Sequence, residues 1–121
     1  MSLAESHHKI HYIEFAASDV ARAKQFYATA FGWTFEDWGP DYASFDAASA
    51  GIAGGFRLSK QEETSGSAAP LIVLYSKDLK ATEAAIVASG GVIAVPIFEF
   101  PGGRRFHFSD GVGNVLAVWS E

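Results

Sequence analysis

Two segments of the chain share one pattern, which predicts a duplicated structural unit. The first segment runs from Asp19 to Gly32, and the second from Asp78 to Gly90. Each begins with an aspartate after a strand-like apolar run, continues with the spacing of an amphipathic helix and ends at a glycine. The two aspartates lie 59 residues apart and the two glycines 58. We therefore expect two copies of one unit around a shared cleft.

Length and composition predict a single domain with a substantial core. The chain has 121 residues, of which 49% are hydrophobic. We expect residues 1–8 to form a disordered or expression-derived tail and residues 9–121 to form one domain. Its two modules would span about 9–58 and 71–120. The polar and small residues of 59–69 predict a linker between them.

Composition also excludes several classes of function. The chain contains no cysteine, which rules out disulfides, thiolate nucleophiles and cysteine-ligated zinc. Its formal net charge of -5 and its lack of a dense Lys/Arg run argue against binding to nucleic acid or to an anionic membrane surface. No stretch approaches the roughly 20 apolar residues of a membrane span, and the N-terminus lacks an apolar signal-peptide segment. We therefore expect a cytoplasmic protein.

Each half is predicted to contain a strand, a helix and three further strands. In the first half, the expected strands are 10–17, 33–38, 42–45 and 52–58, with turns at 39–41 and 47–51. In the second half, they are 71–76, 92–95, 104–109 and 115–120, with 97–100 less regular. This order predicts an α+β fold in which two βαβββ modules form curved mixed sheets around a cleft, with helices on the outer face.

Two motifs give the chain a family resemblance. The first is Asp19-Val-x-Arg-Ala-x-x-Phe-Tyr-x-x-x-Phe-Gly-Trp33, and the second is Phe100-Pro-Gly-Gly-Arg-Arg-Phe-His-Phe-Ser-Asp-Gly-Val-Gly-Asn114. Together with the duplicated order, they resemble the vicinal oxygen chelate superfamily, which includes glyoxalase I, bleomycin-resistance proteins and extradiol dioxygenases. The resemblance covers about residues 9–119. It implies paired βαβββ modules, a cleft between curved sheets and a homodimer.

The resemblance also implies positions for a divalent metal, and this chain departs from the family there. The family's ligands, His or Glu, come from the first and last strands of each module. In this chain those positions hold Tyr12, Gly54 or Gly55, Leu71 or Ile72, and Ala117. A divalent ion needs about three or more N or O side-chain donors at ~2.0–2.2 Å. We therefore expect no metal and no cofactor in the cleft.

Two alternatives stay open. A shift of one residue in the first strand would bring His11 toward the cleft, although it would also turn Ile13 and Phe15 that way. In that case His11, Glu14 and His107 could hold Zn, Ni, Mn or Fe, and the protein would be a metal-dependent lyase, isomerase or dioxygenase. The other alternative is a scaffold whose dimer surface binds another protein.

Glu14 and His107 are the candidate catalytic residues. Glu14 lies two residues after Tyr12 and therefore shares the cleft-facing side of the first strand. A carboxylate there could act as a general base, or it could pair with an arginine at the rim. His107 lies between Phe106 and Phe108, so it would face the cleft if both rings pack under the helices. It could then transfer a proton or bind an anionic oxygen, or serve as a hydrogen-bonded structural residue.

Five further residues are predicted to contact a ligand. Tyr12, Phe56, Tyr75 and Trp119 could line an apolar pocket, although strand aromatics also form cores. Arg105 shares the face of His107 and could bind a carboxylate through two hydrogen bonds, or lie in an ion pair at the edge. We therefore expect a protein that binds a small oxygenated or aromatic molecule without the family's metal. Whether it is an enzyme stays open.

Overall fold

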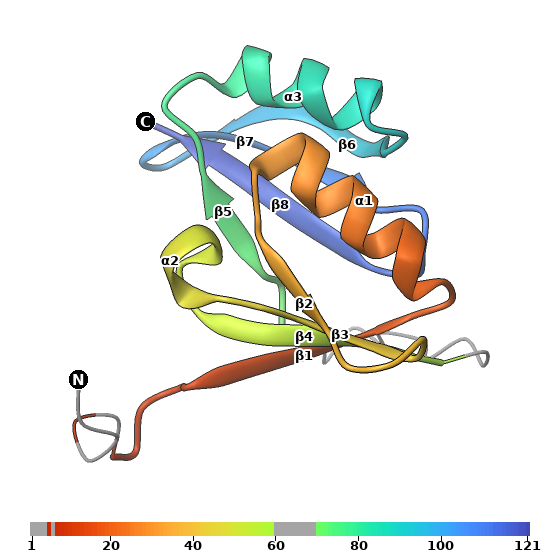
Figure 1. The fold of residues 1–121 in the computed structure, drawn as a ribbon. Coiled ribbons are helices and arrows are strands. Elements are labelled where there is room, and N and C mark those ends of the chain that lie inside the picture. The colour runs from red at the N-terminus through yellow and green to blue at the C-terminus, as the bar shows by residue number, and fades with distance from the viewer. Residues whose placement is uncertain (1–4, 6, 60–69) are drawn as a thin grey trace.

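The computed structural model describes residue 5, residues 7–59 and residues 70–121. Most of the predicted tail and all but Ser59 of the predicted linker lie outside these ranges. The first half contains β1 (Tyr12–Ala17), α1 (Val20–Phe31), β2 (Phe35–Asp37), β3 (Tyr42–Phe45), α2 (Ala47–Ala50) and β4 (Ala53–Leu58). The second contains β5 (Val73–Tyr75), α3 (Leu79–Ala88), β6 (Val92–Phe100), β7 (Gly103–Ser109) and β8 (Val115–Ser120) (Figure 1).

Each half forms its own four-stranded sheet. Sheet A has the strand order β1-β4-β3-β2, and sheet B has the order β5-β8-β7-β6. In each sheet the first strand of the module pairs in parallel with the last, and the other pairs are antiparallel. The predicted α+β class with two βαβββ-like modules is confirmed. The order leaves β1 and β5 each at an edge of its sheet.

The two long helices begin where the sequence predicts. The side chain of Asp19 accepts a hydrogen bond from the backbone of Arg22 at 3.0 Å, and Asp78 caps α3 in the same way. Gly32 ends α1 at φ 77°, a conformation that favours glycine. Among the described residues, no helix combines the length and apolar character needed to span a membrane.

Two segments differ from the prediction. The predicted turn at 47–51 contains the short helix α2, because Asp46 caps it by accepting a hydrogen bond from the backbone of Ser49 at 2.8 Å. The segments 92–95 and 97–100 form one strand, β6, whose register shifts between Ile93 and Phe98. Pro96 is tolerated there because β6 lies at an edge of sheet B.

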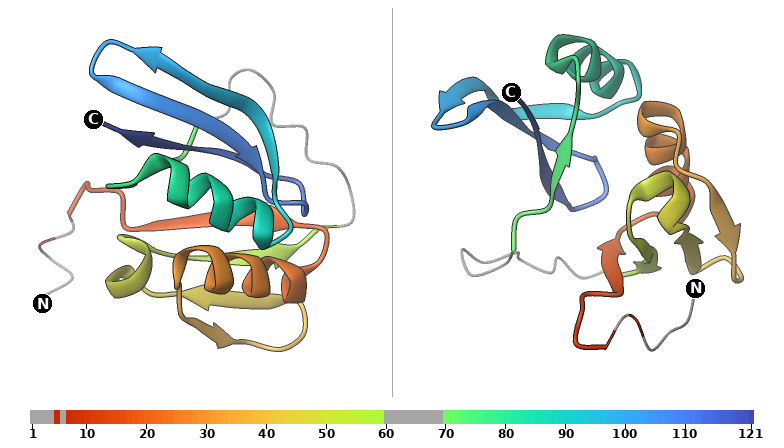
Figure 2. Two further views of the ribbon diagram at one scale, coloured as in Figure 1. Left: turned by 90° about the horizontal axis from the view of Figure 1, so that it is seen from above. Right: turned by 90° about the vertical axis from the view of Figure 1, so that its left-hand side faces the viewer.

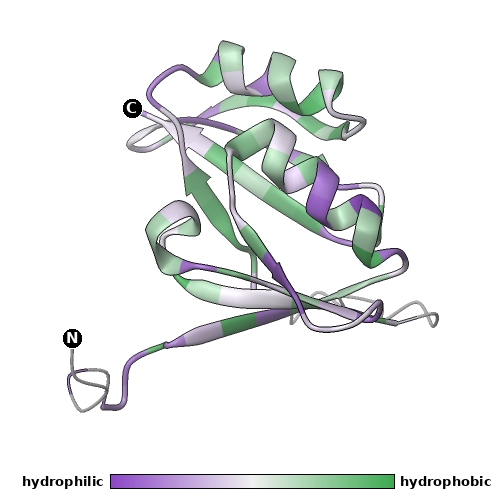
Figure 3. Ribbon diagram, viewed as in Figure 1, coloured by the Kyte–Doolittle hydropathy of each residue, from purple (hydrophilic) through white to green (hydrophobic). Residues whose placement is uncertain are grey.

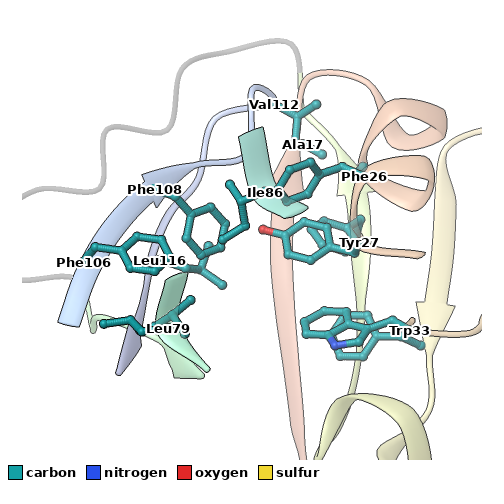
Figure 4. Packing of buried hydrophobic residues seen from close by; sticks show 14 residues of the cluster. Ala17, Phe26, Tyr27, Trp33, Leu79, Ile86, Phe106, Phe108, Val112 and Leu116 are labelled. Atoms are coloured by element: carbon teal, nitrogen blue, oxygen red, sulfur yellow. The ribbon is translucent and has the colours of Figure 1, made fainter. Parts of the chain in front are cut away.

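The two modules share one hydrophobic core. Helices α1 and α3 lie side by side (Figure 2). The side chains of sheet B that face the helices point toward those of α1 and sheet A (Figure 4). The core is formed by Ala17, Ala23, Phe26, Tyr27, Trp33, Phe45, Phe56, Leu79, Ile86, Phe106, Phe108, Val112, Leu116 and Val118. Because both sheets turn their helix-covered faces toward this core, their helix-free faces point away from it.

A buried aspartate fixes the modules to each other. Asp110 accepts hydrogen bonds from the Tyr27 hydroxyl at 2.9 Å, from the backbone of Val112 at 2.9 Å and from the backbone of Asn114 at 3.0 Å. The side-chain amide of Asn114 donates to the carbonyl of Ala16 at 2.9 Å. Burial raises the pKa of Tyr27 well above its usual value, and the charge of Asp110 raises it further. The Asp-Gly-x-Gly-Asn turn of the second motif therefore holds the first module in place.

Candidate functional site

A hydrogen-bonded network lies on the helix-free face of sheet A. Alternation along β1 turns Phe15 into the core and turns Tyr12 and Glu14 to the opposite face. The Tyr42 hydroxyl donates to Glu14 Oε1 at 3.0 Å and is also hydrogen-bonded to the Tyr12 hydroxyl. Arg57 Nε lies 3.4 Å from Glu14 Oε2. We call these four residues, Tyr12, Glu14, Tyr42 and Arg57, the sheet A network.

The backbone of β4 makes room for this network. A Cβ atom on Gly55 would lie 2.5 Å from the Tyr42 hydroxyl oxygen, so only glycine allows the phenol to lie against the strand. Burial raises the pKa of Tyr42, and its hydrogen bonds to Tyr12 and Glu14 raise it further. The phenol therefore stays protonated at neutral pH. The pairing of Glu14 with an arginine, one of the two expected alternatives, is present in the structure.

The helix-free face of sheet B gathers aromatic rings around two basic side chains. Strand pairing aligns Arg105 with Phe98 on one side and Trp119 on the other, and Trp119 is aligned with Tyr75. The Arg105 guanidinium lies 5.3 Å from the centroid of the Phe98 ring and 5.4 Å from that of Phe100. The rings of Tyr75 and Trp119 are 5.2 Å apart. Four of the predicted residues, Tyr75, Arg105, His107 and Trp119, thus share one face.

Two nitrogen atoms on this face lack a hydrogen-bond partner. Arg105 Nε and His107 Nε2 are both buried, and neither is hydrogen-bonded within the described part of the chain. Burial lowers the pKa of His107, and the neighbouring charge of Arg105 lowers it further. The imidazole is therefore held in its neutral form. Buried polar groups in proteins are normally paired, because an unmade hydrogen bond costs about 1–3 kcal/mol.

The same face exposes an unusual amount of apolar surface. The register of sheet B places five exposed side chains on it: Val73, Tyr75, Val92, Val95 and Val115, which are 39% to 62% exposed. Figure 3 shows that β5 and much of β8 are hydrophobic. Exposed apolar side chains gathered on one face are typical of surfaces that contact a ligand or another protein. We call it the sheet B face.

Two predicted placements conflict with the structure. Phe56 was expected to contact a ligand, but alternation along β4 turns it toward the helices, where it is fully buried and stacks on Phe15 with ring centroids 5.1 Å apart. Glu14 and His107, the two candidate catalytic residues, were both expected to face one cleft, but they lie on different sheets. Because each faces away from the shared core, one copy of the chain does not bring them together.

The side chains do not fit a divalent metal at the positions that the resemblance implies. Gly54, Gly55 and Ala117 are buried and offer no side-chain donor, which leaves the phenol of Tyr12. Within residues 7–59 and 70–121, no three His, Asp or Glu side chains come together as a metal site would require. The alternative set of His11, Glu14 and His107 is likewise divided, because His11 directly precedes β1 and Glu14 lies in β1 of sheet A, whereas His107 lies in β7 of sheet B.

A separate cavity of about 730 Å³ lies between the modules. It is lined by Ile13 and Phe15 of β1, by Trp33, by α2 and by residues 71–75. Among the described lining residues, Tyr75 is the only predicted site residue. The cavity is mainly apolar and lies beside the edge strands β1 and β5.

Sequence reasoning missed Tyr42, Arg57, Phe98 and Phe100. Tyr42 alternates with the buried Ala43 and so could have been placed on the helix-free face. Its contact with Glu14 could not, because that contact depends on β4 lying between β1 and β3. The register shift in β6 hides the outward position of the two phenylalanines in the same way.

Comparison with known proteins supports the resemblance. Residues 9–118 match the Glyoxalase/Bleomycin resistance protein/Dioxygenase superfamily. A glyoxalase-related enzyme from Fulvimarina pelagi is similar in structure, with a TM-score of 0.75 and 18% identity over 93% of this chain and 88% of that one. TioX from Micromonospora sp. ML1 has a TM-score of 0.69 and 20% identity, over 91% and 96% of the two chains.

A lactoylglutathione lyase from Agrobacterium tumefaciens has a TM-score of 0.68 and 14% identity, over 92% of each chain. At such identities, structural similarity shows the shared fold alone. No curated protein sequence matches the chain significantly. Because the family match spans nearly the whole sequence, this chain belongs to the Glyoxalase/Bleomycin resistance protein/Dioxygenase superfamily.

Proposed function

We propose that this protein binds a small oxygenated or aromatic molecule without the metal usual in its superfamily. One observation carries the proposal: within the described residues, Arg105 Nε and His107 Nε2 are buried among aromatic rings and have no hydrogen-bond partner. Because neighbouring side chains cover both nitrogens, a ligand oxygen would pair with either one only after those side chains move aside. A flat ligand would also cover the exposed rings of the sheet B face.

The charge of this face favours an anionic group on the ligand. Arg105 carries a permanent positive charge, and His107 is neutral but can donate or accept a hydrogen bond. A carboxylate on an aromatic ring would place its oxygens at these nitrogens and its ring near Trp119 and Tyr75. An aromatic carboxylate is therefore the ligand class we propose for this face.

We further propose that the site is completed in a homodimer. The edge strands β1 and β5 each leave backbone groups open to pairing. The helix-free face of sheet A carries Glu14 and Glu36 beside Arg57, whereas the apolar sheet B face carries Arg105, so an acidic excess on one face would meet a basic side chain on the other. Packing sheet A of one protomer over sheet B of the other would bring Glu14 near His107 of the partner, where they could act as catalytic groups.

We propose a site without a metal because the side chains at the implied positions are poor metal ligands. At the implied positions, the chain offers one phenol among glycines, aliphatic side chains and an alanine. That set cannot replace the hydration shell of a divalent ion. Elemental analysis of untagged protein is the direct test. About one transition-metal ion per chain, lost on mutation of Glu14, would overturn this part of the proposal.

Benzoate is a suitable probe of ligand binding. We expect untagged protein to bind it with a Kd in the millimolar range or tighter, roughly -4 kcal/mol, as measured by calorimetry. Arg105→Ala should weaken binding at least about tenfold, because it removes a charged hydrogen bond. Arg104→Ala is the matched control, since Arg104 is the neighbouring arginine on the opposite side of β7. Equal binding by the Arg105→Ala variant and the natural chain would contradict the proposal.

A further inference from the structure

We infer that the Tyr12 oxygen accepts a hydrogen bond from the ligand, so that this end of the site selects molecules with a hydroxyl or N–H group. The inference rests on the proposed function, and in particular on the homodimer that packs sheet A of one protomer over sheet B of the other, and adds a chemical preference to it. It concerns the sheet A network, whereas the benzoate probe addresses the sheet B face.

The direction of the hydrogen bonds follows from the proton inventory of the network. A carboxylate can only accept, and a phenol has one proton to donate. The Tyr42 hydroxyl donates its proton to Glu14 at 3.0 Å, a bond strengthened by the carboxylate charge. Tyr42 therefore has no proton left for its bond to Tyr12. The Tyr12 hydroxyl must donate to Tyr42, and it presents only lone pairs outward.

The surrounding residues fix this order. Arg57 binds the other oxygen of Glu14 and holds the carboxylate in place. The missing side chain of Gly55 lets Tyr42 reach between Glu14 and Tyr12. Tyr12, at the open end, is 44% exposed and accessible to a ligand. An incoming molecule would therefore contact the Tyr12 hydroxyl oxygen, which can only accept a hydrogen bond.

This preference is the reverse of what a metal would impose. A bound cation in this position would attract ligand oxygen atoms through their lone pairs. The lone pairs of Tyr12 repel such atoms and attract a proton donor. The same position in the fold therefore recognises a hydroxyl or N–H group in this chain.

Phenol and anisole form a matched pair of probes, because methylation removes the donor and leaves the ring. We expect untagged protein to bind phenol about threefold to tenfold more tightly than anisole. The titration is followed by NMR with tyrosine labelled at the ring carbon that carries the hydroxyl, and the Tyr12 signal should shift with phenol. Tyr12→Phe should bind phenol as weakly as anisole. Ser44→Ala, which removes a hydroxyl from the same face but outside the network, should keep the preference.

The outcomes separate this inference from the proposed function. Equal binding of phenol and anisole, no response of the Tyr12 signal, or a preference that survives Tyr12→Phe would overturn the inference alone, provided that benzoate still binds. If none of the three probes binds, both the inference and the proposed function fail.

Discussion

The helix-free faces of the two sheets have the same construction and opposite chemistry. Both are formed by strands of a βαβββ module, and both point away from one shared core. On sheet A, Glu14, Tyr42 and Arg57 satisfy one another. On sheet B, two nitrogens have no hydrogen-bond partner in the described part of the chain and lie among exposed apolar side chains. Duplication thus fixes the backbone, while the outward residues of each strand decide what a face can bind.

Both helix-free faces depend on the same hydrophobic core, so a change in that core should affect the two sheets together. Asp110→Ala would leave the Tyr27 hydroxyl and two backbone N–H groups without their acceptor. We expect the free energy of unfolding to fall by about 3–5 kcal/mol. Chemical denaturation followed by NMR signals from both sheets should show one coincident transition. Asp41→Ala, at an exposed turn, should change little, and separate transitions for the two sheets would contradict a shared core.

The apolar character of the sheet B face can be tested next. Val95→Asp would place a charge where we propose that the partner protomer packs, and the dimer should weaken by about a hundredfold or more. Analytical ultracentrifugation over a range of protein concentrations measures this change. Val87→Asp, on the exposed side of α3, is the matched control and should leave the dimer intact. An unchanged mass for Val95→Asp would exclude this interface.

The hydrogen bonds of the sheet A network depend on the absence of a side chain at Gly55. In Gly55→Ala, the added Cβ would lie 2.5 Å from the Tyr42 hydroxyl and 2.9 Å from the carbonyl of Ala43, so the ring must move. We expect a loss of stability of about 1–3 kcal/mol, measured by urea denaturation. Tyr42→Phe removes the hydroxyl without adding volume and should cost less. Equal stability of the two variants would show that the added Cβ does not displace the Tyr42 ring.

The smallest predicted effect concerns His107 on sheet B and the dependence of stability on pH. Because the pKa of His107 is lowered in the folded protein, the unfolded chain binds the proton more readily below a pH of about 6.5. Stability should therefore rise with pH up to that value and decrease as the pH falls. Urea midpoints at about pH 5 and pH 7 measure the slope. His107→Gln should flatten it, and an unchanged slope in this variant would contradict the prediction.

Local features of the fold were readable from the sequence. Asp19, Asp78 and Gly32 marked the helix ends because capping depends on a few neighbouring residues. Alternation also placed Glu14 and His107 opposite Phe15 and Phe106. Such predictions succeed because helix capping and strand alternation depend only on residues within one turn of helix or on neighbouring residues of a strand.

Features set by distant parts of the chain were not readable. Phe56 and Trp119 are both strand aromatics, but one lies in the core and the other on the sheet B face, and the difference depends on which side of each sheet the helices cover. The partners of Glu14 depend on strand order in sheet A. The orientation of the two modules, which separates Glu14 from His107, depends on the shared core around Tyr27 and Asp110.

The two adjacent glycines of β4 restrict how this protein could be re-engineered to hold a cation. A first side-chain atom at position 54 would come within 2.1 Å of the Ile13 carbonyl oxygen and 2.5 Å of the Phe45 ring, and position 55 is closed by Tyr42. A chelating histidine or glutamate could not be installed here by exchanging one residue. A ligand at either position would therefore require concerted changes in three strands, β1, β3 and β4.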